Sequence, residues 1–285
     1  MPDEKLIKLF KRIVTCDHIK NGWIQPKHPC NKIISFQREQ VAGLDIENFQ
    51  IPEPWSGDII NAPILFVGPN PSYAQEEYYP NSSWCDRDKI NFFSNRFSKY
   101  ANENMGPKLT TDGEYGRPPH YWVRLRHIAA DMFKRKLTEV TPGKDYALTE
   151  AVMCKSQRHI GVESIIRNAM RNPQNTCPAY FMELLPLSKA KVCVCFSNAV
   201  DALKHAISLA HDKPEIIFME EPMDWERLKE CGVRSSKFVF RWRSKIFAFL
   251  PHPSRNWCQD FLMAYLGKGG KKILTNELQK DDILL

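Results

Sequence analysis

The alternation of short apolar runs with helix-like stretches limits most strongly what this chain can fold into. Runs with the apolar, β-branched composition of strands occupy residues 64–68, 146–153, 191–196, 215–219 and 245–250. Helical periodicity lies between and after them, over residues 120–136, 162–171, 179–187, 197–210 and 257–266. Strands that alternate with helices are typical of βαβ units. We therefore predict an α/β fold whose central, mainly parallel sheet is flanked by helices.

The length of the chain sets the expected domain organisation. With 285 residues, two domains of about 150 residues are possible, and one α/β domain of roughly 200 to 250 residues with an extension is equally possible. We expect one α/β domain over residues 61–285 and an N-terminal arm over residues 1–60. Residues 69–118 are predicted to be mostly irregular, and long irregular insertions are usually functional.

Composition and charge narrow the compartment and the partner. The apolar runs are far shorter than the ~20 residues that span a bilayer, and residues 1–14 lack the apolar core of a secretory signal. We therefore expect a cytoplasmic protein with no membrane partner, associated with the nucleoid if the source is bacterial. The formal net charge of +7 fits a polyanion such as DNA. The oligomeric state is left open, and a monomer is expected.

Two predicted strands end in loops that carry polar side chains between prolines. The strand at 64–68 leads into Pro69-Asn70-Pro71, and the strand at 245–250 leads into Pro251-His252-Pro253. Proline fixes φ, so the backbone that presents each polar side chain is stiff. Ligands of open α/β sheets bind at the carboxyl ends of strands. Either loop alone fits a tight turn without chemistry, but their joint placement predicts a site.

At these loops the sequence resembles the uracil-DNA glycosylase superfamily. Gly68-Pro69-Asn70-Pro71-Ser72 is similar to the G-x-N-P-S/G motif of its mismatch-specific and single-strand-selective branches. His252-Pro253-Ser254 is similar to the H-P-S motif, and Arg255-Asn256 follows it as in the single-strand-selective branch. Residues 146–200 resemble the iron–sulfur branch, through Val152-Met153-Cys154, Cys177-Pro178-Ala179-Tyr180 and Lys191-Val192-Cys193-Val194. The resemblance covers residues 63–266, with a loose match over 74–118.

The resemblance implies a uracil-DNA glycosylase-like fold and a monofunctional DNA glycosylase. Such an enzyme flips a damaged or modified base from the stack, hydrolyses its bond to deoxyribose and leaves an abasic site. Asn70 would hold the attacking water through its carbonyl oxygen and touch the base through its NH2 group. His252 would donate a hydrogen bond to the base oxygen where negative charge develops. The resemblance places Gly68 and Pro69 in the base pocket and assigns DNA contacts to Ser72, Ser254, Arg255 and Asn256.

The target base depends on Glu150, which stands where uracil readers of the superfamily have an asparagine. An ionised glutamate only accepts hydrogen bonds and suits the exocyclic amine of a cytosine-like base, whereas a protonated one also donates. Alternatively, Glu150 forms a salt bridge and does not contact the base. The target base can therefore be either uracil-like or a modified cytosine. Phe92 or Phe93 is expected to form the aromatic floor of the pocket, with a core role open for one of them.

Four of the cysteines are candidates for an iron–sulfur cluster. Cys154 and Cys177 match the later pair of the iron–sulfur branch. Cys16 and Cys30 are the only cysteines before Cys85 and would take the place of that branch's first pair. We expect a structural 4Fe–4S cluster. One alternative is a zinc ion on the same thiolates, with His18 or His28 replacing one of them. The other alternative is that the four cysteines are buried and bind no metal.

Two further functions compete with the glycosylase. One is a nucleic-acid-binding relative without catalysis, and the other is a hydrolase of free nucleosides. Segments in which basic and aromatic residues alternate, together with the positive charge, favour a polymeric substrate; they are residues 93–100, 120–127 and 238–245.

Overall fold

The computed structural model describes residues 4–157, 159–171, 176–220 and 237–280. Its first part contains α1 (Glu4–Val14), α2 (Asp17–Ile24), α3 (Asn31–Gln40), β1 (Ile64–Gly68), α4 (Asp86–Ser94), α5 (Ser98–Glu103), α6 (His120–Phe133) and a 3-10 turn at Leu137–Glu139. Its second part contains β2 (Tyr146–Glu150), α7 (Val162–Arg171), α8 (Cys177–Leu184), β3 (Val192–Phe196), α9 (Ala199–Leu209), β4 (Glu215–Met219), β5 (Phe238–Trp242), β6 (Lys245–Leu250), α11 (Pro253–Asn256) and α12 (Phe261–Gln279).

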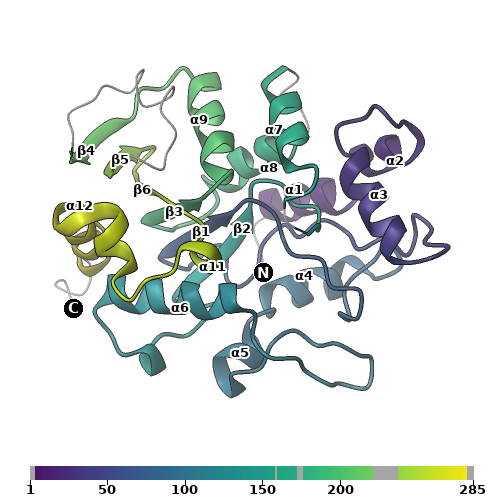
Figure 1. The fold of residues 1–285 in the computed structure, drawn as a ribbon, viewed down its shortest axis with the longest axis horizontal. Helices are drawn as coiled ribbons and strands as arrows, with labels where there is room; N and C mark the ends of the chain where they lie inside the picture. Colours follow the sequence, from purple (N-terminus) through teal and green to yellow (C-terminus); the bar gives the residue numbers. More distant parts are fainter. Residues whose placement is uncertain (1–3, 158, 172–175, 221–236, 281–285) are drawn as a thin grey trace.

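The strands form one six-stranded mixed sheet in the order β2-β1-β3-β6-β5-β4. The first four strands in this order are parallel, and β5 is antiparallel to both β6 and β4. Helices cover both faces: α6 and α12 lie on one side, and α1, α7, α8 and α9 lie on the other (Figure 1). The predicted α/β fold with a mainly parallel sheet is therefore confirmed.

Alternate residues of each parallel strand enter two separate hydrophobic cores. Leu65 and Val67 of β1 pack with the α1 and α9 side, whereas Ile64 and Phe66 pack with the α6 and α12 side. A strand that is buried on both faces needs an uninterrupted apolar run, as β1 has. This burial on both faces explains why the strands that carry the site were recognisable in the sequence.

The segment expected as an arm contributes three helices. Leu6, Phe10 and Ile13 of α1 are buried in the same core as β1. Their spacing places them on one face of the helix. The first helix is thus part of the domain's core, and α2 and α3 pack against each other next to it.

Several predicted elements differ from the observed ones. The strand predicted over 146–153 ends at Glu150, beyond which the N–H groups of Ala151 and Val152 bind the carbonyl oxygens of Gly68 and Pro69. The segment predicted to be irregular, 69–118, includes α4 and α5. Strand β5 was not predicted, because its basic and aromatic residues indicated a surface. None of the helices in the described ranges has the length and apolarity to cross a bilayer.

Candidate functional site

The site lies at the carboxyl edge of the parallel strands. Strands β1, β2 and β6 end there at Gly68, Glu150 and Leu250, and Gly68 and Glu150 are register partners. Residues 69–72, 151–157 with 159–160, and 251–256 continue from these three ends. Because parallel strands end at one edge, three distant segments of the chain meet at this position.

Asn70 is buried with its amide oriented by neighbours on both sides. Its Nδ2 donates to Oγ of Ser156 at 2.9 Å and to the carbonyl oxygen of Pro71 at 3.1 Å. Its Oδ1 lies 2.9 Å from Nδ1 of His159. The NH2 group expected to touch the base is thus used within the protein. The carbonyl oxygen keeps a second lone pair for another donor, such as a water molecule.

His159 is a site residue that the sequence reasoning missed. It has a positive φ of 63° in the loop between β2 and α7. Burial lowers its pKa, and the nearby charge of Arg255 lowers it further, so the ring is neutral near pH 7. In the tautomer that donates from Nδ1 to Asn70, Nε2 carries a lone pair that can accept a proton. No motif marks this histidine; its position shortly after a predicted site strand was the only available signal.

His252 caps the N-terminus of α11, and this fixes its tautomer. The backbone N–H of Ser254 donates to Nδ1 at 3.3 Å, which leaves the proton on Nε2. Burial, followed by the charges on His159 and Arg255, lowers the pKa of His252 to about 4. The ring is therefore a neutral hydrogen-bond donor at neutral pH, as the sequence-based role requires.

Two aromatic contacts position the His252 ring. It stacks on Tyr121 of α6 with 4.9 Å between ring centroids and 19° between planes. It also meets the ring of His159 edge to face at 5.8 Å. Tyr121 was expected on a DNA-binding surface within 120–127, but its ring packs in the site instead. The aromatic group beside the catalytic candidates is thus Tyr121.

Phe92 and Phe93 lie in a different part of the structure. Phe93 is fully buried and packs against Phe10 and Tyr79, so it is a core residue and cannot stack on a base. Phe92 is partly buried between Tyr79 and Trp84. The structure shows no contact between either ring and Asn70 or His252 among the described residues.

Glu150 is buried with 2% of its surface exposed and lies directly against Gly68. A Cβ added to Gly68 would meet Oε2 of Glu150 at 2.0 Å, so a larger residue at this position requires the buried carboxyl group to move. Burial, followed by the charge on Glu53, raises the pKa of Glu150 well above its ordinary value. The raised pKa favours the protonated form of Glu150 over the ionised form. In the described part of the chain, Glu150 forms no salt bridge.

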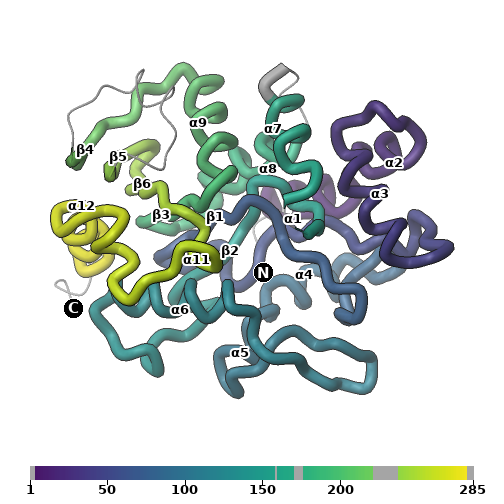
Figure 2. Tube along the Cα trace, in the orientation of Figure 1, coloured from purple at the N-terminus to yellow at the C-terminus, as the bar shows by residue number. Residues whose placement is uncertain are grey.

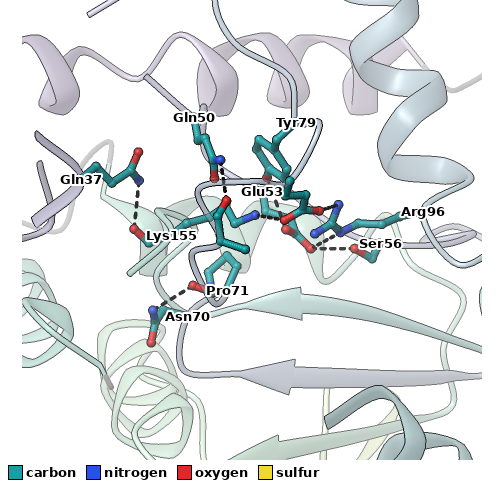
Figure 3. Close-up of polar contacts among 11 residues, drawn as sticks. Gln37, Gln50, Glu53, Ser56, Asn70, Pro71, Tyr79, Arg96 and Lys155 are labelled. Carbon is teal, nitrogen blue, oxygen red and sulfur yellow. Dashed lines mark hydrogen bonds and ion pairs between the residues drawn. The ribbon is translucent and has the colours of Figure 1, made fainter. Parts of the chain in front are cut away.

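Glu53, whose charge acts on Glu150, belongs to a buried network of ion pairs (Figure 3). Arg96 contacts Glu53 at 3.2 Å and Glu77 at 2.6 Å, and Lys155 also pairs with Glu77. Burial alone would raise the pKa of Glu77, but the charges of Arg96 and Lys155 outweigh burial and lower this pKa to about 2. Arg96 is therefore paired with two buried carboxylates and is not available to bind phosphate.

The four residues expected to contact DNA are exposed around the site: Ser72, Ser254, Arg255 and Asn256. Gly68 and Pro69, which were expected in the base pocket, are buried beneath it. The basic segment 238–245 forms β5 and leads to Lys245 at the start of β6. Because β5 is antiparallel to β6, Arg241 and Lys245 lie at the end of β6 opposite Leu250, away from the site.

The four candidate cysteines surround one cavity. Cys16 and Cys30 precede α2 and α3, Cys154 follows β2, and Cys177 begins α8. Each exposes between 4% and 8% of its surface. Figure 2 shows α2 and α3 beside α7, an arrangement that brings the N-terminal segment to the cysteines of the α/β core. His18 and His28 line the same cavity, and their rings approach to 3.2 Å.

Electrostatics within this cavity also indicate that the thiols are neighbours. Burial raises the pKa of all four, and charge on nearby cysteines raises it further for Cys30, Cys154 and Cys177. Three of the cysteines stand at helix N-termini, where the helix dipole favours negative charge. Within the described ranges, no three His, Cys, Asp or Glu side chains are arranged to hold a single metal ion.

Comparison with known proteins adds no family. No protein-family model matches the chain, and no curated protein is significantly similar to it in sequence. The class that the structure defines is thus an α/β domain with a histidine- and asparagine-containing site at the carboxyl edge of its sheet, and its function is inferred from that site.

Proposed function

We propose that the chain is a monofunctional DNA glycosylase with a uracil-DNA glycosylase-like fold. The observation that carries the proposal is the meeting of the two motif loops through His159. Asn70 is 2.9 Å from His159, and the ring of His159 is 5.8 Å from that of His252. Loops with similarity to both motifs of one superfamily therefore present their polar side chains to a common space.

The reaction joins a water oxygen to C1′ and breaks the bond from C1′ to the base nitrogen, whose electron pair leaves with the base. Oδ1 of Asn70 holds the water against the sugar face. The proton that the water loses passes to solvent, because Nε2 of His159 points away from Asn70 when Nδ1 donates to Oδ1. Positive charge on the sugar and negative charge on the base both grow toward the transition state, so the groups must be fixed before the reaction begins.

His252 stabilises the leaving base. Its Nε2–H donates to the pyrimidine oxygen on which negative charge accumulates, and the stacked Tyr121 ring holds the imidazole plane. A neutral imidazole can do this without giving up its proton. Arg255, exposed on α11 beside this ring, supplies positive potential for the phosphate backbone.

A 4Fe–4S cluster held by Cys16, Cys30, Cys154 and Cys177 is the cofactor that fits the cysteine cavity best. Four thiolates from separate chain segments are the usual ligand set of such a cluster, and zinc on the same thiolates is the alternative. The cluster would be structural and would link the N-terminal helices to α8 and the end of β2. The free thiols, with their raised pKa values, would lose protons when it binds.

A panel of DNAs tests the proposed function. Purified protein would be incubated with single- and double-stranded oligonucleotides that carry uracil, hypoxanthine or modified cytosines, and alkali-labile abasic sites would be scored. We expect abasic sites in at least one pyrimidine substrate and no strand cleavage before alkali. Binding without abasic sites would indicate the non-catalytic relative, and cleavage of free nucleosides alone would indicate the small-molecule hydrolase.

A further inference from the structure

Two buried polar atoms without partners lie beside the proposed catalytic groups. Oε2 of Glu150 and the hydroxyl oxygen of Tyr121 have no hydrogen-bond partner within the described structure. Burial raises the pKa of Tyr121, and charge on Glu150 raises it further, so the two groups are electrostatic neighbours. Buried polar atoms are nearly always paired in folded proteins, and an orphaned pair at a ligand site indicates the place of a ligand.

Charge balance around Glu150 decides its form. Glu53, its charged neighbour, belongs to a network that contains Glu53 and Glu77 as acids and Arg96 and Lys155 as bases (Figure 3). Two carboxylates and two cations cancel within this network. Glu53 also accepts hydrogen bonds from Ser56 and Tyr79, and this further stabilises its charge.

An additional carboxylate at Glu150 would have no counter-charge. The ionisable groups that face it are Glu53, which repels an anion, and Tyr121, which is neutral. A buried charge without a partner costs far more than a buried neutral acid. Glu150 is therefore a neutral carboxylic acid in the site, with an O–H donor next to a C=O acceptor.

We propose that neutral Glu150, with the Tyr121 hydroxyl beside it, reads the hydrogen-bonding edge of the flipped base and accepts both uracil-type and cytosine-type pyrimidines. Uracil presents N3–H and O4, whereas cytosine presents N3 and an exocyclic amine. A carboxylic acid matches either edge, because its proton can reside on either oxygen. A carboxylate would match only the amine of cytosine. This inference rests on the proposed function and assigns the substrate class of the same site.

The neutral acid also helps the leaving group in both cases. Its O–H donates to O4 of uracil or to N3 of cytosine, and both atoms gain negative charge as the glycosidic bond breaks. An ionised Glu150 would repel that charge. The same side chain thus couples base recognition to bond cleavage.

Binding of non-cleaved DNA tests the proposal separately from turnover. The probes are oligonucleotides with a single 2′-fluoro-2′-deoxyuridine or 2′-fluoro-2′-deoxycytidine, whose 2′-fluorine disfavours positive charge on the sugar. Affinity would be measured by fluorescence anisotropy for the wild type, Glu150→Gln, Glu150→Leu and Tyr121→Phe. An oligonucleotide without the modified sugar gives the background affinity.

The wild type should bind the two probes within about 10-fold of each other. Glu150→Gln, which donates and accepts but cannot ionise, should keep both affinities, whereas Glu150→Leu should lose roughly 10-fold or more for each. Raising the pH should weaken probe binding by the wild type more than by Glu150→Gln. Infrared difference spectra at neutral pH should show the carbonyl band of a protonated acid that Glu150→Gln lacks.

Several results would overturn the proposal. Unchanged affinity in Glu150→Leu would show that the side chain does not read the base. A carboxylate band from Glu150 at neutral pH, or selective binding of the cytosine probe alone, would show an ionised reader. Intact probe binding without excision from cleavable DNA would instead contradict the proposed function and leave the base-reading role standing. Thermal unfolding of each variant identifies any that fail to fold.

Discussion

Nδ1 of His159 lies 2.9 Å from Oδ1 of Asn70, and this contact ties the loop after β2 to the loop after β1. It fixes the Asn70 amide with its oxygen toward His159, while Ser156 holds the nitrogen. A side chain fixed at both ends loses little freedom when a water or substrate binds. The positioning of Asn70 thus depends on a residue outside either motif.

We predict that His159→Ala lowers the single-turnover excision rate by roughly 10- to 100-fold, because Asn70 and the water lose a fixed partner. DNA affinity should change much less. His211→Ala is the matched control, because His211 is exposed and its φ of 53° resembles the 63° of His159, so the backbone cost of alanine is similar. Equal rate losses in the two variants would assign the effect to backbone strain.

Acid should destabilise the fold through His252. Its pKa is about 4 in the folded chain and 6.5 in the unfolded chain, so the unfolded chain binds more protons between these values. The stability due to this group is present above pH 6.5 and is lost as the pH falls toward 4, by up to about 3 kcal/mol. His252→Asn, which can still cap α11, should lose less stability than the wild type between pH 7 and 4.5 in urea unfolding. Identical losses would show that His252 titrates normally.

Gly68→Ala should destabilise the domain, because the new Cβ would overlap Oε2 of Glu150. Overpacking at a buried position typically costs about 1 to 3 kcal/mol. Gly68→Ala combined with Glu150→Ala should recover much of that loss, since the obstructing carboxyl is gone. A double-mutant cycle in urea measures the coupling, and strictly additive losses would contradict the close approach of the two residues.

The purified protein should be brown, with broad visible absorbance that disappears on oxidation or chelation. Cys154→Ser or Cys177→Ser should bleach it and lower its solubility, because the cluster connects separate chain segments. Cys85→Ser is the control and should keep the colour, since Cys85 is exposed and outside the cavity. A colourless protein that contains one zinc ion per chain would contradict the cluster and indicate a tetrathiolate zinc site.

The sequence predicted the strands that carry the site because burial on both faces demands continuous apolar runs. Strand β5 was missed, since Arg241 and its neighbours resemble a surface segment although most of the strand is buried. Helix α1 left a readable signal in the spacing of Leu6, Phe10 and Ile13, but its packing against the core depends on contacts with α8 that are distant in sequence.

The candidate site was predictable only where proline-flanked motifs mark it. Asn70 and His252 stand in such loops, whereas His159 and Tyr121 come from segments without a motif and meet them only in three dimensions. The sequence also could not predict the protonation of Glu150, because it depends on burial of the carboxyl group and on the charge of Glu53, a residue distant in sequence.

The central claim is that Asn70 and His252 act on the glycosidic bond, and single-turnover excision measured together with DNA affinity tests it most directly. Asn70→Ala and His252→Ala should each lower the excision rate by on the order of 10² to 10³, while the affinity for the same DNA changes far less. Normal excision in both variants, or equal losses of binding and excision, would contradict the catalytic role of these two residues.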